Sequence, residues 1–149
     1  MSEPQPKLLI PALKPFYDWA EPLTWPLIRV TVGLMLLPHG LGKVMAGIDA
    51  TATNILLPRG ITPAEPFAVV LMILETIGGL CVALGLFTRF WAAALTIEMI
   101  VVVSVHMPKG FLWIKGGYEY GLMWGLVMLA VALRGGGPYS LDRKIGKQL

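Results

Sequence analysis

Residues 67–87 read FAVVLMILETIGGLCVALGLF, and Glu75 is the only charged side chain among them. A helix of about 20 mostly apolar residues crosses the roughly 30 Å of hydrocarbon in a bilayer. We therefore predict that this stretch forms a transmembrane helix with a carboxyl group near its middle.

Three further apolar stretches flank this segment and predict three more crossings of the membrane. They cover residues 23–42, 90–106 and 118–133. The chain of 149 residues is 56% hydrophobic and 14% charged, with a mean hydropathy of +0.70, which is far from the composition of a soluble domain. The sequence thus predicts an all-α fold, an integral membrane four-helix bundle that forms one domain over residues 1–149.

The segments between and before these stretches are expected to lie outside the hydrocarbon. Residues 1–22 mix aromatic and charged side chains, which indicates an interfacial segment along the lipid headgroups, broken by Pro11 and Pro15. Residues 45–66 are rich in Gly and Pro and predict a long external loop, with a short helix near residues 52–57. The length of this loop makes it the best candidate for a lid or a docking surface.

Basic residues are distributed unevenly between the two ends of the predicted bundle. Thr88 and Arg89 predict a tight turn, so the second and third crossings should be antiparallel neighbours. Four crossings then place both termini and this turn on one side. The basic residues of that side are Lys7, Lys14, Arg89, Arg134, Arg143, Lys144 and Lys147, and those of the other side are Lys43, Arg59, Lys109 and Lys115. The positive-inside rule predicts cytoplasmic termini, with residues 134–149 as a cytoplasmic tail.

Two carboxyl groups are predicted inside the bilayer. Glu75 and Glu98 each lie near the middle of a crossing, where a lone carboxylate is costly unless it takes up a proton. Each therefore needs a partner or a proton. His39 and Lys43 are four residues apart at the end of the first crossing, hence on one helix face, and either is a candidate partner for Glu75.

The polar residues at this end of the bundle admit more than one interpretation. In the structural one, satisfied hydrogen bonds hold four short helices in register. In the functional one, a histidine and a carboxyl group exchange protons with a small redox-active or carbonyl-bearing ligand of the quinone type. A third interpretation is transport of protons or a small solute. The candidates for ligand binding or proton exchange are His39, Lys43, Glu75 and Glu98, together with His106 and Glu119, which are expected to lie near each other.

Composition excludes or disfavours several other kinds of site. Cys81 is the only cysteine, so the chain has no internal disulfide and no cysteine-based metal or iron–sulfur site, and we predict no metal and no covalent cofactor. Axial haem ligation would need His39 and His106, which are expected near one membrane face without any haem-attachment motif. A formal net charge of +3 without a basic stripe argues against nucleic acid and for anionic lipid.

One periodic pattern in the last crossing predicts how it packs. Gly117, Gly121 and Gly125 recur at every fourth position, which gives a flat stripe on which another helix can approach closely. The pattern indicates helix packing before any function.

Four short motifs follow one another along the chain. They are HGLGK at residues 39–43, ETIGG at 75–79, LGLFTR at 84–89 and GPYSLD at 137–142. In this order and spacing they resemble the DoxX family, and the resemblance covers the chain from about Arg29 to Asp142. The residues that match the family pattern are Arg29, His39, Gly42, Lys43, Glu75, Gly78, Gly79, Arg89 and Asp142. Glu98 and His106 are not placed in that pattern.

The resemblance implies a small four-helix membrane protein of bacteria or archaea, in a family linked to thiosulfate or quinol oxidation and to membrane-associated oxidoreductase complexes. For this chain it implies a quinone-facing subunit in the inner membrane, at most a non-catalytic or quinone-site subunit of an oxidoreductase. The resemblance therefore also implies that the chain binds a quinone and works with a partner redox protein. It also implies that Gly78 and Gly79 let a neighbouring backbone approach beside Glu75, and that Arg89 with Asp142 ties the turn to the tail.

An alternative of a different class is a structural or assembly subunit of a larger membrane complex, without ligand chemistry of its own. Its contact surfaces would be the glycine stripe and the outer loop, and a homo-oligomer is one such assembly. The absence of any flavin, iron–sulfur or haem-attachment motif means that electrons in the redox reading come from another protein.

Overall fold

The computed structural model describes residues 6–148, and every regular element within them is helical. The long helices are α1 (Lys14–Ala46), α3 (Ala64–Ile73), α4 (Gly79–Leu84), α5 (Thr88–His106) and α6 (Glu119–Arg134), and the short ones are α2 (Ile48–Thr51) and α7 (Leu141–Ile145). A π-helical turn, Leu74–Gly78, joins α3 and α4 into one rod. The predicted all-α fold is confirmed.

Three helical stretches are long and apolar enough to cross a bilayer. They are Pro11–Ala46, Ala64–Leu84 and Thr88–Lys109. Helix α6 has 16 residues, or about 24 Å, which is shorter than the hydrocarbon thickness, and it packs along α5. These apolar helices show that the chain is an integral membrane protein in contact with the lipid bilayer.

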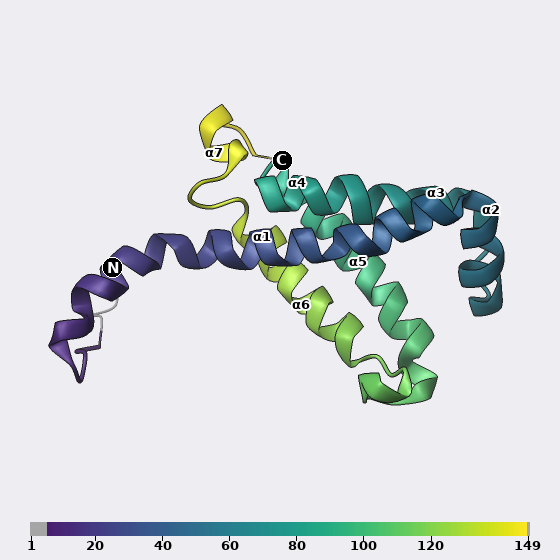
Figure 1. Ribbon diagram of the computed structural model, residues 1–149, viewed down its shortest axis with the longest axis horizontal. Helices are drawn as coiled ribbons and strands as arrows, with labels where there is room; N and C mark the ends of the chain where they lie inside the picture. Colours follow the sequence, from purple (N-terminus) through teal and green to yellow (C-terminus); the bar gives the residue numbers. More distant parts are fainter. Residues whose placement is uncertain (1–5, 149) are drawn as a thin grey trace.

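The helices form two pairs that cross each other (Figure 1). Helix α1 packs along the rod made by α3, the π-helical turn and α4, while α5 packs along α6. The main core lies where the pairs meet, and its buried side chains are Trp25, Val32, Leu36, Val82, Ala92, Leu95, Met99, Met128 and Val131.

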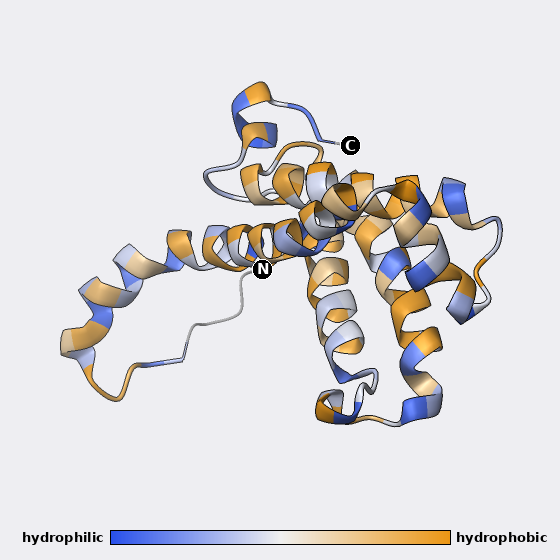
Figure 2. Ribbon diagram, turned by 45° about the vertical axis from the view of Figure 1, so that its right-hand side comes forward, coloured by the Kyte–Doolittle hydropathy of each residue, from blue (hydrophilic) through white to orange (hydrophobic). Residues whose placement is uncertain are grey.

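Hydrophobic residues recur along the helices that pack together (Figure 2), and many of their side chains are exposed. Leu27, Ile97, Leu126 and Leu133 are among the large hydrophobic side chains that are exposed on them. A helix that is apolar all round needs an apolar surrounding on every side, which the hydrocarbon supplies.

Glycine lets α1 approach the rod backbone to backbone. A Cβ atom on Gly33 would lie 2.5 Å from the Gly79 carbonyl oxygen and 2.6 Å from the Ala83 nitrogen. A Cβ atom on Gly40 would lie 2.6 Å from the Thr76 side chain. Real Cβ atoms do not approach other atoms this closely, so only glycine permits the observed separation.

The same device brings α5 against its neighbours. Trp91 packs on Gly78, where a Cβ atom would lie 2.9 Å from the indole ring. Cβ atoms on Gly121 and Gly125 would lie 3.0 Å from Val102 and 3.1 Å from Met99. The glycine stripe of α6 is therefore covered by α5, except at Gly117, which packs on the loop at Gly110 and Phe111.

The predicted break of the N-terminal segment at Pro15 is wrong. Helix α1 begins at Lys14 and runs without interruption through Pro15, Pro22, Pro26 and Pro38 to Ala46. Pro15 occupies the first turn, where no intrahelical N–H is needed and the fixed φ of proline suits the helix. The segment is thus continuous with the first apolar helix.

The predicted turn at Thr88 and Arg89 lies slightly earlier in the chain. Gly85 and Phe87 have φ angles of 71° and 47°, and Thr88 is already the first residue of α5. Asp142 explains this start, because its carboxylate accepts hydrogen bonds from the Phe87 nitrogen at 2.7 Å and from the Thr88 nitrogen and hydroxyl at 3.0 and 2.6 Å. A carboxylate that satisfies these free donors stabilises the helix N-terminus.

Arg29 and Arg89 close the same end of the molecule. Arg29 is 1% exposed, and its Nη1 donates to the carbonyl oxygens of Val82 and Ala83, the last turn of α4, at 2.9 and 2.6 Å. Arg89 donates to the carbonyl oxygens of Ala132 and Leu133 at the end of α6, at 3.1 and 2.5 Å. Each guanidinium therefore satisfies helix-terminal carbonyls that have no partner within their own helix.

The expected pairing of Arg89 with Asp142 is not found. Asp142 binds the start of α5 and Arg89 binds the end of α6, so the turn and the tail are joined through helix ends rather than through an ion pair. Trp25 donates from its indole nitrogen to the Gly135 carbonyl oxygen at 2.9 Å, which brings the early part of α1 to the same end.

Candidate functional site

A cavity of about 360 Å³ lies at the opposite end of the two helix pairs. Its volume falls within the roughly 300–1,000 Å³ typical of small-molecule sites. Apolar side chains from α3, α5 and the segment after α2 make most of the wall. The polar residues that line it are Lys43, Arg59, Glu75, Glu98 and His106. Mostly apolar walls with a few converging polar groups are typical of a ligand site.

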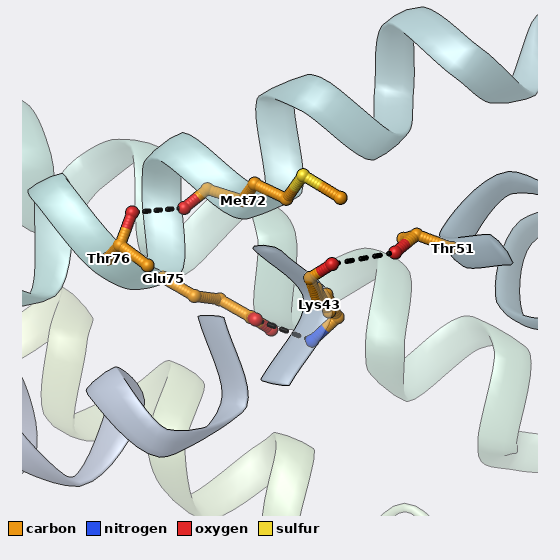
Figure 3. A network of polar contacts seen from close by, with 5 residues as sticks. All are labelled: Lys43, Thr51, Met72, Glu75 and Thr76. Carbon is orange, nitrogen blue, oxygen red and sulfur yellow. Dashed lines mark hydrogen bonds and ion pairs between the residues drawn. The ribbon is translucent and has the colours of Figure 1, made fainter. Parts of the chain in front are cut away.

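Lys43 and Glu75 form an ion pair in this cavity (Figure 3). Lys43 lies in the last turn of α1, and its ammonium donates to Oε2 of Glu75, which belongs to the π-helical turn. Of the two partners expected for Glu75, the structure thus selects Lys43. The pair thus joins the end of α1 to the π-helical turn of the rod through two largely buried charged side chains.

The backbone around the pair is held by two hydroxyl groups. Thr51 donates from its hydroxyl to the Lys43 carbonyl oxygen at 3.4 Å, and Thr76 donates to the carbonyl oxygen of Met72 (Figure 3). A π-helical turn holds one residue more than an α-helical turn, which changes the direction of the side chains that follow. Such turns are frequent at functional sites.

Glu98 lies beside this pair on α5. Its side chain is 6% exposed and lines the same cavity. Neither carboxyl oxygen has a hydrogen-bond partner within residues 6–148. A buried polar group without a partner is rare in native proteins, because it loses its hydrogen bonds to water and gains none in return. The carboxyl group of Glu98 therefore has unused hydrogen-bonding capacity at the wall of the cavity.

His106 closes the cavity at the end of α5. Its Nδ1 lies 2.7 Å from the Gly116 carbonyl oxygen, which assigns the proton to Nδ1 and makes the ring a donor there. In the neutral imidazole, Nε2 is then the nitrogen without a proton, and the side chain lines the cavity.

The segment after α1 covers the outer end of the cavity. It continues from α2 through a π-helical turn, Ala52–Leu56, and a 3₁₀ turn, Leu57–Arg59. Ala52 and Leu56 pack on Ala64 and Ala68 in a second, smaller core. The short helix predicted near residues 52–57 is thus found within the predicted loop, as these two helical turns, and it packs on α3.

Several predicted candidates lie away from the cavity. His39 is exposed on α1 and does not line it. Glu119 accepts a hydrogen bond from the Trp113 nitrogen at 3.1 Å and makes no contact with His106 through that carboxylate. Of the two residues that share this face of α1, only Lys43 therefore lines the cavity.

Arg59 is the cavity residue that the sequence did not single out. Its guanidinium donates to the carbonyl oxygen of Ile55, and the side chain lines the rim of the cavity. A signal was present in the sequence, because Ile55, Leu56, Leu57 and Ile61 make the surroundings of Arg59 more apolar than a solvated loop would be.

The cluster combines one ammonium, two carboxyl groups and one imidazole at the edge of an apolar space. If both carboxyl groups were ionised, the Lys43, Glu75 and Glu98 group would have one excess negative charge, which a single proton neutralises. Such a group can hold and exchange a proton with a bound molecule. Within residues 6–148, no group of three or more His, Cys, Asp or Glu side chains is arranged to hold a metal ion.

Comparison with known proteins gives a family for the chain. An uncharacterized protein of Haemophilus influenzae is 31% identical over 126 residues, which covers 81% of this chain and 90% of that protein. An uncharacterized membrane protein of Mycobacterium tuberculosis is 31% identical over 134 residues, covering 81% of this chain and 80% of that protein. No solved structure matches the chain significantly. The model of the DoxX family matches residues 24–107, which include Lys43, Glu75 and Glu98, and the chain belongs to the DoxX family.

Proposed function

We propose that this protein is a membrane subunit with a ligand site for a quinone or a similar lipophilic molecule with carbonyl groups, and that it works with a redox partner protein. The observation that supports this proposal is the apolar cavity in which Glu98 is buried without a hydrogen-bond partner next to the Lys43–Glu75 pair.

The roles of the polar groups follow from their positions. A protonated Glu98 donates a hydrogen bond to a carbonyl oxygen in the cavity, and it supplies a proton when that oxygen gains electron density. The Lys43 ammonium favours negative charge that develops nearby, and Glu75 holds the ammonium in place. His106 offers Nε2 as an acceptor for a hydroxyl group of the reduced molecule.

Reduction of a quinone to a quinol takes up two electrons and two protons. The chain contains no motif that binds flavin, iron–sulfur clusters or covalent haem, so the electrons come from the partner protein. This subunit therefore binds the molecule, exchanges protons with it and anchors the partner at the membrane.

The proposed setting is the bacterial inner membrane with both termini in the cytoplasm. The ends of α1, α4 and α6 that meet around Arg29, Arg89 and Trp25 would form the cytoplasmic side, which is the more basic one. The cavity and its helical cover then lie toward the periplasmic side.

The assembly interpretation named two contact surfaces, the glycine stripe of α6 and the outer loop, and most of the glycine stripe is covered within this chain. Gly121 and Gly125 are covered by Val102 and Met99 of α5, so they do not offer a groove to a helix of another chain. The remaining surface is the helical cover, residues 48–61, which the ligand interpretation uses as a wall of the cavity.

The test is mass spectrometry of the mildly solubilised protein, searching at once for an isoprenoid quinone and for co-purifying proteins. The proposal expects a bound quinone that is lost in Glu98→Leu, which removes the hydrogen-bond donor, and in Glu75→Gln, which removes the charge that holds Lys43. The matched control is Glu65→Gln, an exposed carboxyl at the start of α3 that does not line the cavity. A stable complex with other proteins, without quinone in the wild type, would favour the assembly interpretation.

A further inference from the structure

Some walls of the cavity are formed by tightly packed side chains and others are open at the surface. Toward the outer end, the cover formed by residues 48–61 packs on α3 through Ala52, Leu56, Ala64 and Ala68. Ile55, Leu56 and Ile61 of this cover also line the cavity. On the α1 side, the Lys43–Glu75 pair joins α1 to the rod. Packed side chains thus close the cavity between the cover and α3, and the ion pair closes it between α1 and the rod.

On the side between α3 and α5, by contrast, no packed side chains of residues 6–148 close the cavity. Helix α5 packs on the π-helical turn and α4, whereas α3 packs on α1 and the cover, so α3 and α5 diverge from the π-helical turn (Figure 1). The cavity occupies the space between the diverging helices. Its lining side chains on this side are also exposed at the surface, with Val70 46% and Ile97 64% exposed, next to Phe67 and Val101.

These four exposed residues belong to stretches that are long and apolar enough to span a bilayer, Ala64–Leu84 and Thr88–Lys109. In a membrane, exposed apolar side chains at such positions face hydrocarbon rather than water. The opening is therefore bordered by apolar side chains at positions that hydrocarbon would cover in a bilayer.

We infer that this opening, bordered by Phe67, Val70, Ile97 and Val101, is a lateral portal through which an amphiphile with a long apolar chain enters the cavity directly from the bilayer. The polar head reaches Glu98 and the Lys43–Glu75 pair, and the apolar chain leaves between α3 and α5 into the lipid. The identity of the head rests on the proposed function, whereas the portal itself is a property of the helices.

The arrangement also restricts the ligand class. The wall is apolar apart from the cluster and Arg59, so a molecule with polar groups along its whole length would lose their hydration without replacement. A compact head of a few hydrogen-bonding atoms on a hydrocarbon chain fits both the wall and the opening.

The portal is tested first without any ligand. In a Cys81→Ser background, a fluorescent bimane label is placed at Val102→Cys, a cavity wall residue of α5, and the protein is studied in lipid nanodiscs. Comparison labels are Ile100→Cys, exposed on the same helix outside the cavity, and Met99→Cys, buried against α6. We expect acyl-chain-brominated lipids to quench the labels at residues 102 and 100 to a similar extent and to spare the label at 99. Quenching at residue 102 by aqueous iodide but not by brominated lipid, or by neither, would overturn the portal whatever the ligand is.

A second measurement uses the border residues. Ile97→Trp fills the border, and Ile100→Trp places the same bulk on the lipid-facing surface outside it. With a benzoquinone that has a decyl chain as probe, we expect Ile97→Trp to slow association about tenfold and Ile100→Trp to leave it unchanged. Equal rates in both variants would overturn lateral entry. A wild type that does not bind the probe at all would contradict the proposed function, and the quenching result would still decide the portal.

Discussion

The Lys43 ammonium at the end of α1 is paired with the Glu75 carboxylate in the π-helical turn between α3 and α4, 32 residues further along the chain. Within residues 6–148 it is the only ion pair between different helices, since the other, Lys14–Asp18, lies within α1. It fixes the charge balance of an apolar cavity and leaves the neighbouring carboxyl of Glu98 without a partner.

From the Lys43–Glu75 ion pair we predict that substitutions of its two residues have non-additive effects on the stability of the protein. Removing one partner of a buried ion pair typically costs about 3–5 kcal/mol, because the other charge remains buried alone. We expect Lys43→Met and Glu75→Gln each to lower the thermal midpoint in detergent micelles, and the double variant to be more stable than the sum of the two losses predicts. A double variant whose loss equals that sum would show that the pair does not couple α1 to the rod.

The glycines of α1 predict a matched pair of substitutions. Gly33→Ala places a methyl group against the Gly79 oxygen, and we expect it to destabilise the protein by about 1–3 kcal/mol through separation of the helices. A Cβ atom on Gly42 would meet no other atom within 4 Å, so Gly42→Ala should be neutral or slightly stabilising in the same helix. Thermal unfolding in micelles measures both, and equal effects would contradict the close approach.

The carboxylate cap on α5 predicts how the tail is held. Asp142→Ala removes the acceptor for the Phe87 and Thr88 nitrogens, which costs about 1–2 kcal/mol for a helix N-cap. We expect faster limited proteolysis after Arg134 in this variant, with Arg143→Ala, an exposed residue of α7, as the control. An unchanged cleavage rate in Asp142→Ala would mean that other contacts hold the tail.

The two histidines predict opposite results for ligand binding. His106 lines the cavity and His39 does not, although the sequence indicated both as candidates. We expect His106→Phe to weaken binding of a short-chain quinone about tenfold, because one hydrogen-bonding group is lost, and His39→Phe to have no effect. Binding is followed by calorimetric titration in nanodiscs. The reverse order of effects would place the ligand outside the cavity.

The fold followed from the sequence because apolar length and turn residues are local signals. Residues 67–87 contain a single charged residue, and the helical rod runs from Ala64 to Leu84, so it starts and ends three residues before the predicted stretch. The prediction started the third helix at residue 90, whereas α5 starts at Thr88. The carboxylate that stabilises this start belongs to Asp142, more than 50 residues further along the chain, so no local signal indicates it. The short helix near residues 52–57 was predicted, but its packing on α3 was not, since that depends on tertiary contacts of Ala52 and Leu56 with Ala64 and Ala68.

The candidate site was predicted only in part. Helical spacing placed His39 and Lys43 on one face, and the need of Glu75 for a partner led to either residue. The choice of Lys43 depends on how α1 crosses the rod at Gly33 and Gly40, which is a tertiary property. The meeting of Glu98 with this pair likewise depends on how α5 leaves the π-helical turn, and no spacing within one helix contains that information.

The central claim is that the unpartnered carboxyl of Glu98 binds the head of a lipophilic ligand. The most direct measurement is calorimetric titration of the wild type, Glu98→Leu and Glu65→Leu in nanodiscs with a benzoquinone that has a decyl chain. We predict saturable binding to the wild type and to Glu65→Leu, and binding that is weaker by about tenfold or more in Glu98→Leu, which removes the hydrogen-bond donor. Equal affinity of Glu98→Leu and the wild type, or no saturable binding to the wild type, would contradict the account.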